Sequence, residues 1–528
     1  MRDSSSSSSS LTWLHGHGKK SVVLCLVASL LLVSVMVLAF DSKTPSSWFS
    51  SYYYSPSLSS RDRRSGDALS VTSSSSTLGA SSSEEGVVDQ FHSSYASLPP
   101  TAAPSPAPAP APAPAPAAVY FRDSISEAAI QLTRRPRRRD VKLEKIELDL
   151  AKARAAIRDA ISNTNNRSAL ADIDYVPQGP VYRNAYAFHR SYLEMEKLFK
   201  VYIYEEGEPP IFHDGPCRSI YSTEGRFIYA IEMENQMRTR DPELAHVHFL
   251  PFSVVNMVRL IYEPNSHNME PLRRTVLDYI NVISGKHPYW NRSLGADHFM
   301  LSCHDWGPSV SSTNRHLFMN SIRVLCNANT SEGFNPSKDV SLPEINIKSD
   351  VIAGMVGGPS ASHRPILAFF AGGNHGPVRP LLLKHWKDKD SDVHVTEYLP
   401  KGVSYYDMMR KSKYCLCPSG YEVASPRIVE AIYLECVPVT ISDHYVLPFS
   451  DIINWRAFSV QVSVEDIPNI KNILMSISPR QYIRMQRRVR VVRRHFMVNN
   501  PPKRFDVFYM ILHSVWLRRL NIRIHQED

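Results

Sequence analysis

From about residue 196 onward, short apolar segments alternate with amphipathic stretches that have helical spacing. We expect strands at Lys200–Tyr204, His246–Pro251, His298–Ser302, Arg323–Cys326, Ile366–Ala371, Val393–Leu399, Tyr414–Cys417, Val437–Ile441 and Phe458–Val462. Helices are expected between them, for example over Ser404–Lys411 and Arg427–Leu434. Alternation of this kind is typical of parallel sheets that are covered by helices on both faces. The sequence therefore predicts an α/β fold.

A break over residues 340–363 divides this α/β region. It contains three glycines and a proline: Gly354, Gly357, Gly358 and Pro359. Such a cluster is typical of a loop or hinge. We therefore expect two α/β domains, over residues 176–350 and 351–495, followed by a C-terminal helix within residues 496–528.

Residues 41–121 are rich in Ser, Pro and Ala and contain few aliphatic residues. A segment of this composition cannot bury a hydrophobic core, so we expect a disordered stem. Its last part, residues 99–118, alternates Pro with Ala and is expected to be extended, at about 3.1 Å per residue.

Residues 21–40 form a run of twenty residues without a charge. As a helix with a rise of about 1.5 Å per residue, this run would span about 30 Å, the hydrocarbon thickness of a bilayer. Lys19 and Lys20 stand just before it, so the positive-inside rule places residues 1–20 in the cytosol and the rest of the chain in the lumen. A cleaved signal peptide is the alternative, but its apolar region usually has only about 7–15 residues. We therefore expect a single-pass type II membrane anchor.

Residues 122–175 are expected to form a basic stem region. Over residues 140–161, apolar residues recur at steps of three and four and would line one stripe of a helix: Ile146, Leu150, Ala153, Ile157 and Ile161. This helix is expected to pack on the folded body, on itself or on a partner, which would give a homo- or hetero-oligomer. The arginine run over residues 134–139 would suit nucleic acid in a nuclear protein, but behind a luminal anchor we expect no nucleic-acid partner.

The luminal placement makes disulfide bonds and N-linked glycans possible. Apart from Cys25 in the apolar run, the chain has six cysteines: Cys217, Cys303, Cys326, Cys415, Cys417 and Cys436. Six cysteines allow fifteen pairings, and the sequence does not choose among them. A bond between Cys415 and Cys417 is disfavoured, because both would lie on one face of a strand. We expect N-linked glycans at the triplets that begin with Asn166, Asn291 and Asn329.

In open parallel sheets, ligands bind beyond the carboxyl ends of the strands. After the strand that ends at Cys417, Ser425 suits an N-cap and Pro426 the first helical position, so a helix is expected to start here. Arg427 can bind a phosphate beside the helix N-terminus. Glu430 lies three residues later on the same face and can accept hydrogen bonds from the hydroxyls of a ribose. The alternative is a surface ion pair between Arg427 and Glu430, worth less than about 1 kcal/mol.

The strand Ile366–Ala371 runs into Gly372, Gly373 and Asn374. At such a loop the backbone can approach a diphosphate closely, although the sequence is not a Walker loop because no Gly-Lys-Ser/Thr follows. A purely structural turn is the alternative interpretation.

The strand His298–Ser302 runs into a polar cluster that contains His304 and Asp305. Either side chain can accept a proton from an attacking hydroxyl. Adjacent His-Asp pairs are also common in loops that have no catalytic role.

Two carboxylate motifs are candidates for metal binding: Asp172-x-Asp174 and Asp388-x-Asp390-x-Asp392. The second begins like a calcium loop, but Val393 stands where position six needs Gly and Leu399 where position twelve needs Glu. We expect both motifs to be solvated loops, and we expect no metal cofactor.

The net charge of +9 favours acidic partners. The segment Arg480–Arg504 contains nine basic residues and no acidic one. A solvated helix face is one interpretation, and a surface for an acidic polysaccharide acceptor is the other.

Several of these segments together resemble a known family. The stretch Cys415–Phe458 contains Pro418-Ser-Gly, Ser425-Pro-Arg427-x-x-Glu430, Cys436-Val-Pro-Val and Leu447-Pro-Phe-Ser-Asp-x-Ile-x-Trp455. The segments His298-Phe-Met-Leu, Asp305-Trp-Gly and Phe370-Ala-Gly-Gly fit the same pattern. Over about residues 195–495 the chain therefore resembles the exostosin-like plant glycosyltransferases of family GT47.

This resemblance implies a GT-B fold, in which two Rossmann-like domains face each other across a cleft. It implies that the domain 176–350 binds the acceptor and the domain 351–495 binds a UDP-sugar, with inversion at the anomeric carbon and without metal. By the same resemblance, Arg427 would stabilise the leaving diphosphate and Glu430 would bind the ribose. The family pattern does not fix the base, so Asp305 and His304 rest on our own inference.

The layout of tail, anchor, stem and luminal body is also similar to that of Golgi type II glycosyltransferases. We therefore expect transfer to a cell-wall polysaccharide, a pectin or hemicellulose side chain, and the basic C-terminal segment favours acidic pectin. Two alternatives stay open: a non-catalytic scaffold subunit of the same fold, and a luminal lectin-like module without a nucleotide site.

Overall fold

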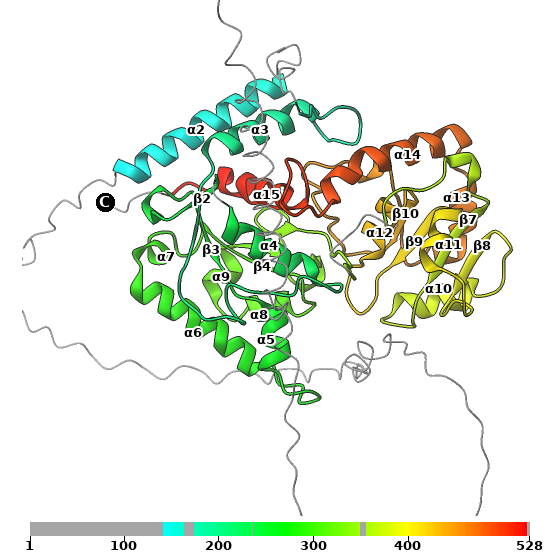
Figure 1. Cartoon of the computed structure of the whole chain (residues 1–528), viewed down its shortest axis with the longest axis horizontal. Coiled ribbons are helices and arrows are strands. Elements are labelled where there is room, and N and C mark those ends of the chain that lie inside the picture. Colours follow the sequence, from blue (N-terminus) through cyan, green and yellow to red (C-terminus); the bar gives the residue numbers. More distant parts are fainter. Residues whose placement is uncertain (1–140, 163–173, 235, 349–354, 525–528) are drawn as a thin grey trace, which may run out of the picture. The chain divides into compact units, whose positions relative to one another are not determined.

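The structure is a computed structural model that describes residues 141–162, 174–234, 236–348 and 355–524 (Figure 1). The expected cytosolic tail, membrane anchor and disordered stem lie outside the described residues. Within the described ranges, no helix has the length and apolar character needed to cross a bilayer. All of these residues belong to one compact unit, Gly86–Asp528.

The first sheet has six parallel strands in the order β2-β1-β3-β4-β5-β6. Its strands are β1 (Val201–Ile203), β2 (Arg238–Thr239), β3 (Val247–Leu250), β4 (His298–Ser302), β5 (Ile322–Leu325) and β6 (Val340–Ser341). The sequence analysis missed β2 and β6, because each has only two residues and therefore no readable pattern.

The second sheet has five parallel strands in the order β11-β10-β9-β7-β8. Its strands are β7 (Ile366–Ala371), β8 (Val393–Thr396), β9 (Ser412–Pro418), β10 (Val437–Ile441) and β11 (Val460–Val462). All nine expected strands are therefore present, and the α/β class is confirmed. Every residue of β3, β4, β5 and β10 is buried, as parallel strands covered on both faces should be.

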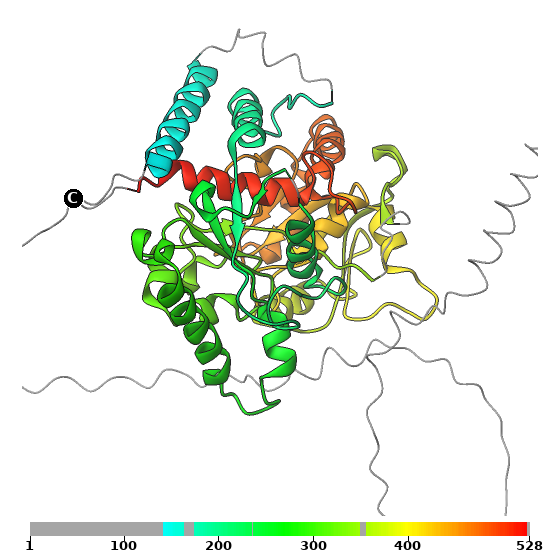
Figure 2. The same ribbon diagram turned by 60° about the vertical axis from the view of Figure 1, so that its left-hand side comes forward.

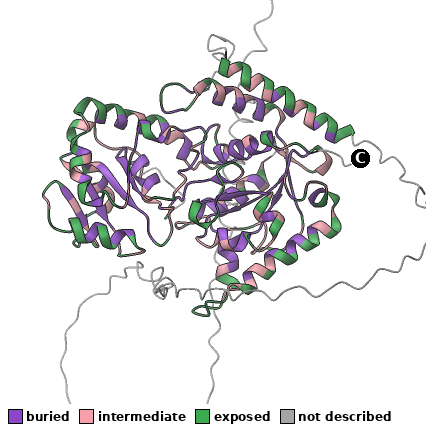
Figure 3. Ribbon diagram, turned by 180° about the vertical axis from the view of Figure 1, so that it is seen from behind, coloured by how far each residue is buried: buried purple, intermediate pink, exposed green. Residues whose placement is uncertain are grey.

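Helices connect the strands and cover the sheets (Figure 1). The longer connections among the strands of the first sheet contain α4 (Ser222–Met233), α5 (Val254–Leu260), α6 (Glu270–Lys286), α7 (Pro288–Ser293), α8 (Gly307–Ser311), α9 (Arg315–Met319), η3 (Pro242–Leu244) and η4 (Thr330–Glu332). Those of the second sheet contain α10 (Val378–Trp386), α11 (Tyr405–Lys411), α12 (Arg427–Tyr433) and η7 (Trp455–Ala457). The strands of both sheets are buried, and the covering helices expose their outer faces (Figure 3).

The remaining helices lie outside these connections: α2 (Val141–Ser162), α3 (Ala185–Leu198), η6 (Ala361–His363), η8 (Ile467–Asn469), α13 (Ile470–Met475), α14 (Pro479–Val492), η9 (Arg493–Phe496) and α15 (Val507–Asn521). Several helices of both groups begin at a polar N-cap, whose side chain fixes the residue at which the helix starts. Ser404 before α11, Ser478 before α14 and Asp506 before α15 each accept a hydrogen bond from a backbone N–H in the first turn.

The expected stem helix exists as α2, and it packs on α3 and α15 (Figure 2). Leu150 at the centre of the predicted stripe is fully buried, whereas Ile161 at its end is exposed. Arg519 of α15 donates a hydrogen bond of 2.6 Å to Glu147, and Arg154 donates one of 3.0 Å to the carbonyl of Leu520. Of the three expectations for this helix, the structure therefore shows packing on the folded body.

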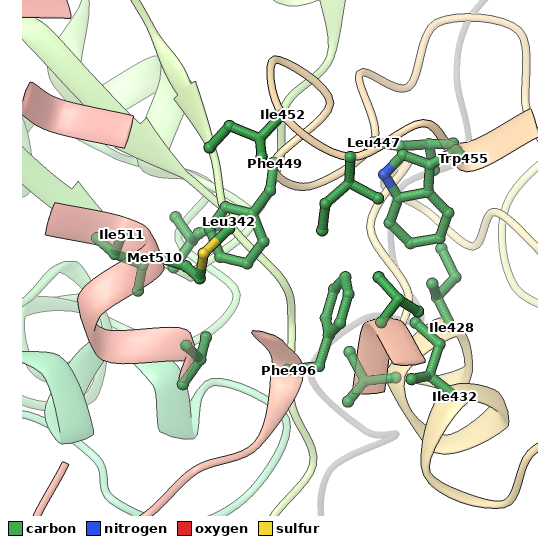
Figure 4. Packing of buried hydrophobic residues seen from close by; sticks show 14 of the residues in the cluster. Leu342, Ile428, Ile432, Leu447, Phe449, Ile452, Trp455, Phe496, Met510 and Ile511 are labelled. Atoms are coloured by element: carbon green, nitrogen blue, oxygen red, sulfur yellow. The ribbon is translucent and has the colours of Figure 1, made fainter. Parts of the chain in front are cut away.

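The two sheets share one apolar cluster, which includes residues of the Leu447–Trp455 motif. Figure 4 shows Phe449 beside Leu342, which follows β6, and Met510 of α15 close by. Trp455 lies near Leu447, and its indole N–H donates to the carbonyl of Pro448 at 2.8 Å. The motif therefore joins the second sheet to the first by apolar packing.

Two disulfides settle the pairing that the sequence left open. Cys303 pairs with Cys326 and thereby joins the ends of β4 and β5, and Cys415 of β9 pairs with Cys436 just before β10. Cys217 and Cys417 are not in disulfides. Each bond links neighbouring strands of one sheet, and Cys303–Cys326 lies at the carboxyl ends of β4 and β5, the edge where parallel sheets bind ligands.

Replacing both Cys415 and Cys436 by alanine is expected to lower the free energy of unfolding by about 3 kcal/mol, because the bond closes a loop of 21 residues in the unfolded chain. Denaturant unfolding of the full chain measures this effect. Cys217→Ser is the matched control and should change the free energy by less than about 0.5 kcal/mol. An equal loss in both variants would contradict the expectation.

Candidate active site

Arg427 is the first residue of α12, and its guanidinium lies across the carboxyl end of β7. One Nη donates to the carbonyl of Ala371 at 3.3 Å, and the group stacks over the Phe370 ring at 5.2 Å. A Cβ at Gly372 would lie 2.2 Å from that guanidinium, which would have to move to make room for it. The Nε is buried and has no hydrogen-bond partner among the described residues. Gly372 thus leaves room for the guanidinium of Arg427. The sequence had predicted a different role for this glycine, a close approach of its backbone to a diphosphate.

The expected N-cap role of Ser425 is wrong. Helix α12 begins at Arg427 with Pro426 in the cap position, and the N–H of Ile428 bonds to the backbone carbonyl of Ser425 rather than to its hydroxyl. The Ser425 hydroxyl is buried and lacks a hydrogen-bond partner in the part of the chain that the structure describes.

A second guanidinium, which the sequence analysis missed, belongs to Arg379 of α10. It donates to the carbonyl of Gly373 at 3.2 Å and is buried to 8% exposure. A Cβ at Gly420 would lie 2.8 Å from it, so the loop after β9 also approaches this group closely. The side chain of Asn374 is exposed. A lone arginine in a short helix gave no signal in the sequence.

Glu430 lies one turn after Arg427, as predicted, and is buried. Its carboxylate accepts a hydrogen bond of 3.1 Å from the Tyr405 hydroxyl. Burial raises the pKa of Glu430, although the charge of Arg427 acts in the opposite direction. Burial also raises the pKa of Tyr405 well above its usual range, so this hydroxyl remains a donor. The pair is therefore an internal one, not the exposed surface ion pair of the alternative interpretation.

His304 and Asp305 follow the carboxyl end of β4, as expected. His304 is buried, its Nδ1 accepts the backbone N–H of Trp306 at 3.1 Å, and its ring lies 4.9 Å from that of Tyr221. The Tyr221 hydroxyl hydrogen-bonds to the carboxylate of Asp305. Burial raises the pKa of Tyr221 well above its usual range, and the charge of Asp305 adds to this effect, so the phenol stays protonated. Asp305 is thus the better oriented of the two candidate bases.

Asn327, just after β5, connects the two sheets at this point. Its Nδ2 donates to Glu422 in the loop after β9 at 2.8 Å, to Glu332 at 3.2 Å and to the backbone carbonyl of Asp305 at 3.0 Å. Glu422 and Glu332 also hydrogen-bond to each other. Two carboxyl groups can do so only when they share a proton.

Glu344, in the segment that follows β6, is the third acidic residue that the sequence analysis missed. Burial raises its pKa well above the usual range, and the charge of Asp305 raises it further. The charges of Arg427 and Arg379 act on the same carboxyl and lower its pKa. Glu344 is therefore electrostatically coupled both to Asp305, which follows the first sheet's β4, and to the two guanidinium groups of the second sheet.

Glu422→Gln is expected to alter the pH dependence of stability. Burial, followed by the charges of Glu332 and Asp305, raises the pKa of Glu422 to about 9. The folded chain therefore holds a proton that the unfolded chain releases above about pH 4.5, so the free energy of unfolding falls as the pH rises from there toward 9. Glutamine removes this titration. The variant's Tm relative to the native chain should therefore rise by at least about 2 °C from pH 5 to pH 8.

Scanning calorimetry of the full chain at the two pH values measures this shift. The exposed Glu465→Gln is the matched control and should show no such change. An identical Tm difference at both pH values would show that Glu422 does not hold the shared proton.

The three glycosylation triplets lie in different settings. Asn291 is exposed. Asn329 is buried, and its Nδ2, the atom to which a glycan would be attached, donates to Glu332 at 2.8 Å. A glycan at Asn329 would break this contact. Asn166 lies outside the described residues.

Carboxylate and histidine groups that could bind metal lie elsewhere. His248, Asp297 and His298 are buried with their potential ligand atoms within 4.8 Å, at the amino ends of β3 and β4 and thus at the edge opposite to Asp305. The Asp297 carboxylate already accepts hydrogen bonds from Ser293, at 2.6 Å, and from His298, at 2.8 Å.

In the expected calcium-like loop, Lys471 lies 2.7 Å from Asp390 and 2.9 Å from Asp392. These carboxylates therefore have a cation of the chain itself as a partner. Of the other motif, Asp172 lies outside the described residues and Asp174 is exposed.

Helix α14 contains much of the basic C-terminal segment. Arg490 and Arg493 form ion pairs with the buried Glu435, at 2.6 and 2.8 Å. Part of the positive charge of this segment is therefore neutralised by an acidic residue of the same chain. Arg480, Arg484 and Arg487 are exposed along one face.

Comparisons with known proteins point to one family. Residues 195–477, just over half of the chain, match the family described as the Exostosin GT47 domain. The probable glycosyltransferase At5g03795 of Arabidopsis thaliana is 66% identical over 393 residues, which cover 74% of this chain and 75% of the relative. The probable glycosyltransferase At5g25310 of the same plant is 58% identical, over 72% of this chain and 79% of its own.

More distant relatives have more specific names. The probable β-1,4-xylosyltransferase IRX10 of Arabidopsis thaliana is 28% identical, over 60% of this chain and 81% of its own. Among solved structures, TarM matches with a TM-score of 0.24 at 14% identity, over 44% of this chain and 57% of its own. The fold described above is assigned from its own strand order. The family match and the sequence identities show that the chain belongs to the exostosin GT47 family of glycosyltransferases.

Proposed function

We propose that this chain transfers a sugar from a UDP-sugar to a cell-wall polysaccharide, with inversion at the anomeric carbon. The observation that supports this proposal best is the pair of guanidinium groups, Arg379 and Arg427, at the strand ends of the second sheet, coupled through Glu344 to Asp305 of the first. Two parallel sheets whose strand ends contribute to one site also favour the GT-B arrangement.

In the proposed reaction, a hydroxyl of the acceptor attacks the anomeric carbon while the bond to the diphosphate breaks. Asp305 accepts the hydroxyl proton, and the Tyr221 hydroxyl bond fixes the orientation of its carboxylate. Arg427 and Arg379 stabilise the charge that develops on the UDP. With two guanidinium groups in this role, we propose that the reaction needs no metal ion. Glu430 is proposed to bind the ribose.

The setting of the reaction is proposed from the sequence. The uncharged run of residues 21–40 after Lys19 and Lys20 supports a type II anchor in the Golgi membrane with the folded body in the lumen. The family membership and the xylosyltransferase name of a relative support a hemicellulose or pectin side chain as the product.

The test is UDP release by the full chain. UDP-xylose, UDP-galactose, UDP-arabinose and UDP-glucuronic acid are offered with xylan and pectic oligosaccharides in the presence of EDTA. Release that depends on the acceptor and disappears in Arg427→Ala is the expected result. A folded chain that neither releases nor binds UDP would overturn the proposal and favour the non-catalytic scaffold.

A further inference from the structure

Apart from Glu430 beside Arg427, charges in the candidate active site are grouped by sign. The guanidinium groups Arg379 and Arg427 belong to the second sheet and contact the loop after β7. Carboxyl groups gather where the loop after β9 meets the first sheet, and they are those of Asp305, Glu332, Glu344 and Glu422. A diphosphate therefore fits the cationic side, and the acceptor must bind on the acidic side.

On the acidic side, the carboxyl groups already disfavour further negative charge. Glu332 and Glu422 hydrogen-bond to each other and share the Asn327 amide as a donor, which requires a proton between them. Burial raises the pKa of Glu344 well above its usual range, and the charge of Asp305 raises it further. A further carboxylate, brought by a substrate, would meet the negative charges of Asp305 and of the Glu332–Glu422 pair.

The same groups are well suited to an uncharged sugar. Hydroxyl groups donate to carboxylates, and a protonated carboxyl can donate to a hydroxyl or a ring oxygen. The Oδ1 of Asn327 is a further acceptor, since the residue is 1% exposed and this oxygen has no hydrogen-bond partner in the described part of the chain. It lies on the amide whose Nδ2 contacts Glu422 and Glu332, so it belongs to the acidic side.

We propose that the acceptor residue that receives the new sugar is uncharged, and that Glu422 and Glu332 bind its hydroxyl groups and exclude a uronate from this position. This inference rests on the proposed function and narrows its acceptor. It replaces the expectation of an acidic pectin residue at the site of transfer. The exposed arginines of α14 belong to another element and do not change the charge beside Asp305.

The experiment compares acceptors that differ only in charge. Tetragalacturonate with free carboxylates and the same oligosaccharide as its full methyl ester are offered to the full chain with the UDP-sugar panel, beside xylotetraose and β-1,4-galactotetraose. We expect kcat/KM for the uncharged acceptors that react to exceed that for the free acid by at least 10-fold. In the double variant Glu332→Gln, Glu422→Gln this ratio should fall at least threefold, whereas Glu465→Gln should leave it unchanged.

Binding is measured separately, by saturation-transfer NMR of the tetragalacturonate and its ester with UDP present. A free acid that reacts or binds as well as its ester overturns the inference and leaves the proposed function intact. If UDP is released with no acceptor at all, the proposed function fails, and the binding comparison alone then decides the charge preference. A ratio that is unchanged in the double variant would also overturn the roles given to Glu332 and Glu422.

Discussion

Replacing Arg427 by alanine is expected to lower kcat/KM for sugar transfer by about 10²–10³-fold, the usual cost of removing a group that stabilises developing charge. The guanidinium is fixed by the carbonyl of Ala371 and the Phe370 ring, so it is oriented before the donor binds. Arg427→Lys keeps the charge but loses the planar fork and the stacking, and it should recover only part of the activity. UDP release measures the loss of transfer activity in each variant, and calorimetry measures its affinity for UDP.

Gly372→Ala tests the same prediction without removing the charge. Its Cβ would stand 2.2 Å from the Arg427 guanidinium, which would have to move. We therefore expect a loss of activity similar to that of Arg427→Ala. The matched control is Gly402→Ala, since no atom lies within 4 Å of the added Cβ, although Gly402 has a positive φ and a small loss of stability is expected there. Full activity in Gly372→Ala would show that the position of Arg427 does not matter.

Replacing Asp305 by asparagine is expected to lower kcat by about 10²–10⁴-fold, because the amide keeps the shape of the side chain but cannot accept the hydroxyl proton. The KM for the UDP-sugar should change little, since we propose that the diphosphate binds to the other sheet. Initial rates with varied donor separate these two effects. Tyr221→Phe removes only the bond that orients Asp305 and should cost about tenfold or less.

Two outcomes would contradict this assignment of the base. A large rise in the donor KM of Asp305→Asn, with kcat preserved, would place Asp305 in donor binding. Full activity in Asp305→Asn together with inactivity in Glu344→Gln would move the role of base to Glu344, the neighbouring carboxyl.

The sequence predicted the strands because each is an apolar segment bounded by polar turns. It predicted Arg427 and Glu430 because both lie on one helix turn just after a strand, and the structure places Arg427 at the end of β7 and Glu430 beside Tyr405 of α11. Arg379, Glu344 and Asn327 could not be predicted in this way, since their roles depend on segments far apart in the sequence, such as Asn327 with Glu422 and Glu344 with Arg427. Glu422 and Glu332 were within reach, because Glu422 lies in the motif Cys415–Phe458 and Glu332 directly follows the glycosylation triplet that begins with Asn329.

The errors have local physical causes. Ser425 was expected to cap a helix, but Pro426 in the cap position and the backbone carbonyl of Ser425 take over that role. Helix α2 was predicted as a stem helix that packs on itself, on a partner or on the folded body, and its apolar stripe packs on α3 and α15, which follow at very different distances along the chain.

Helix α15 has a consequence for the order in which the molecule is made. It packs against α2, α3, β5 and β6, and its Arg518 donates to the carbonyl of Asp339 at 2.8 Å. The first sheet is synthesised well before this helix, which covers it. A nascent chain must therefore hold an unfinished first sheet until translation reaches about residue 521, and a premature stop before Val507 would damage the sheet that was made first.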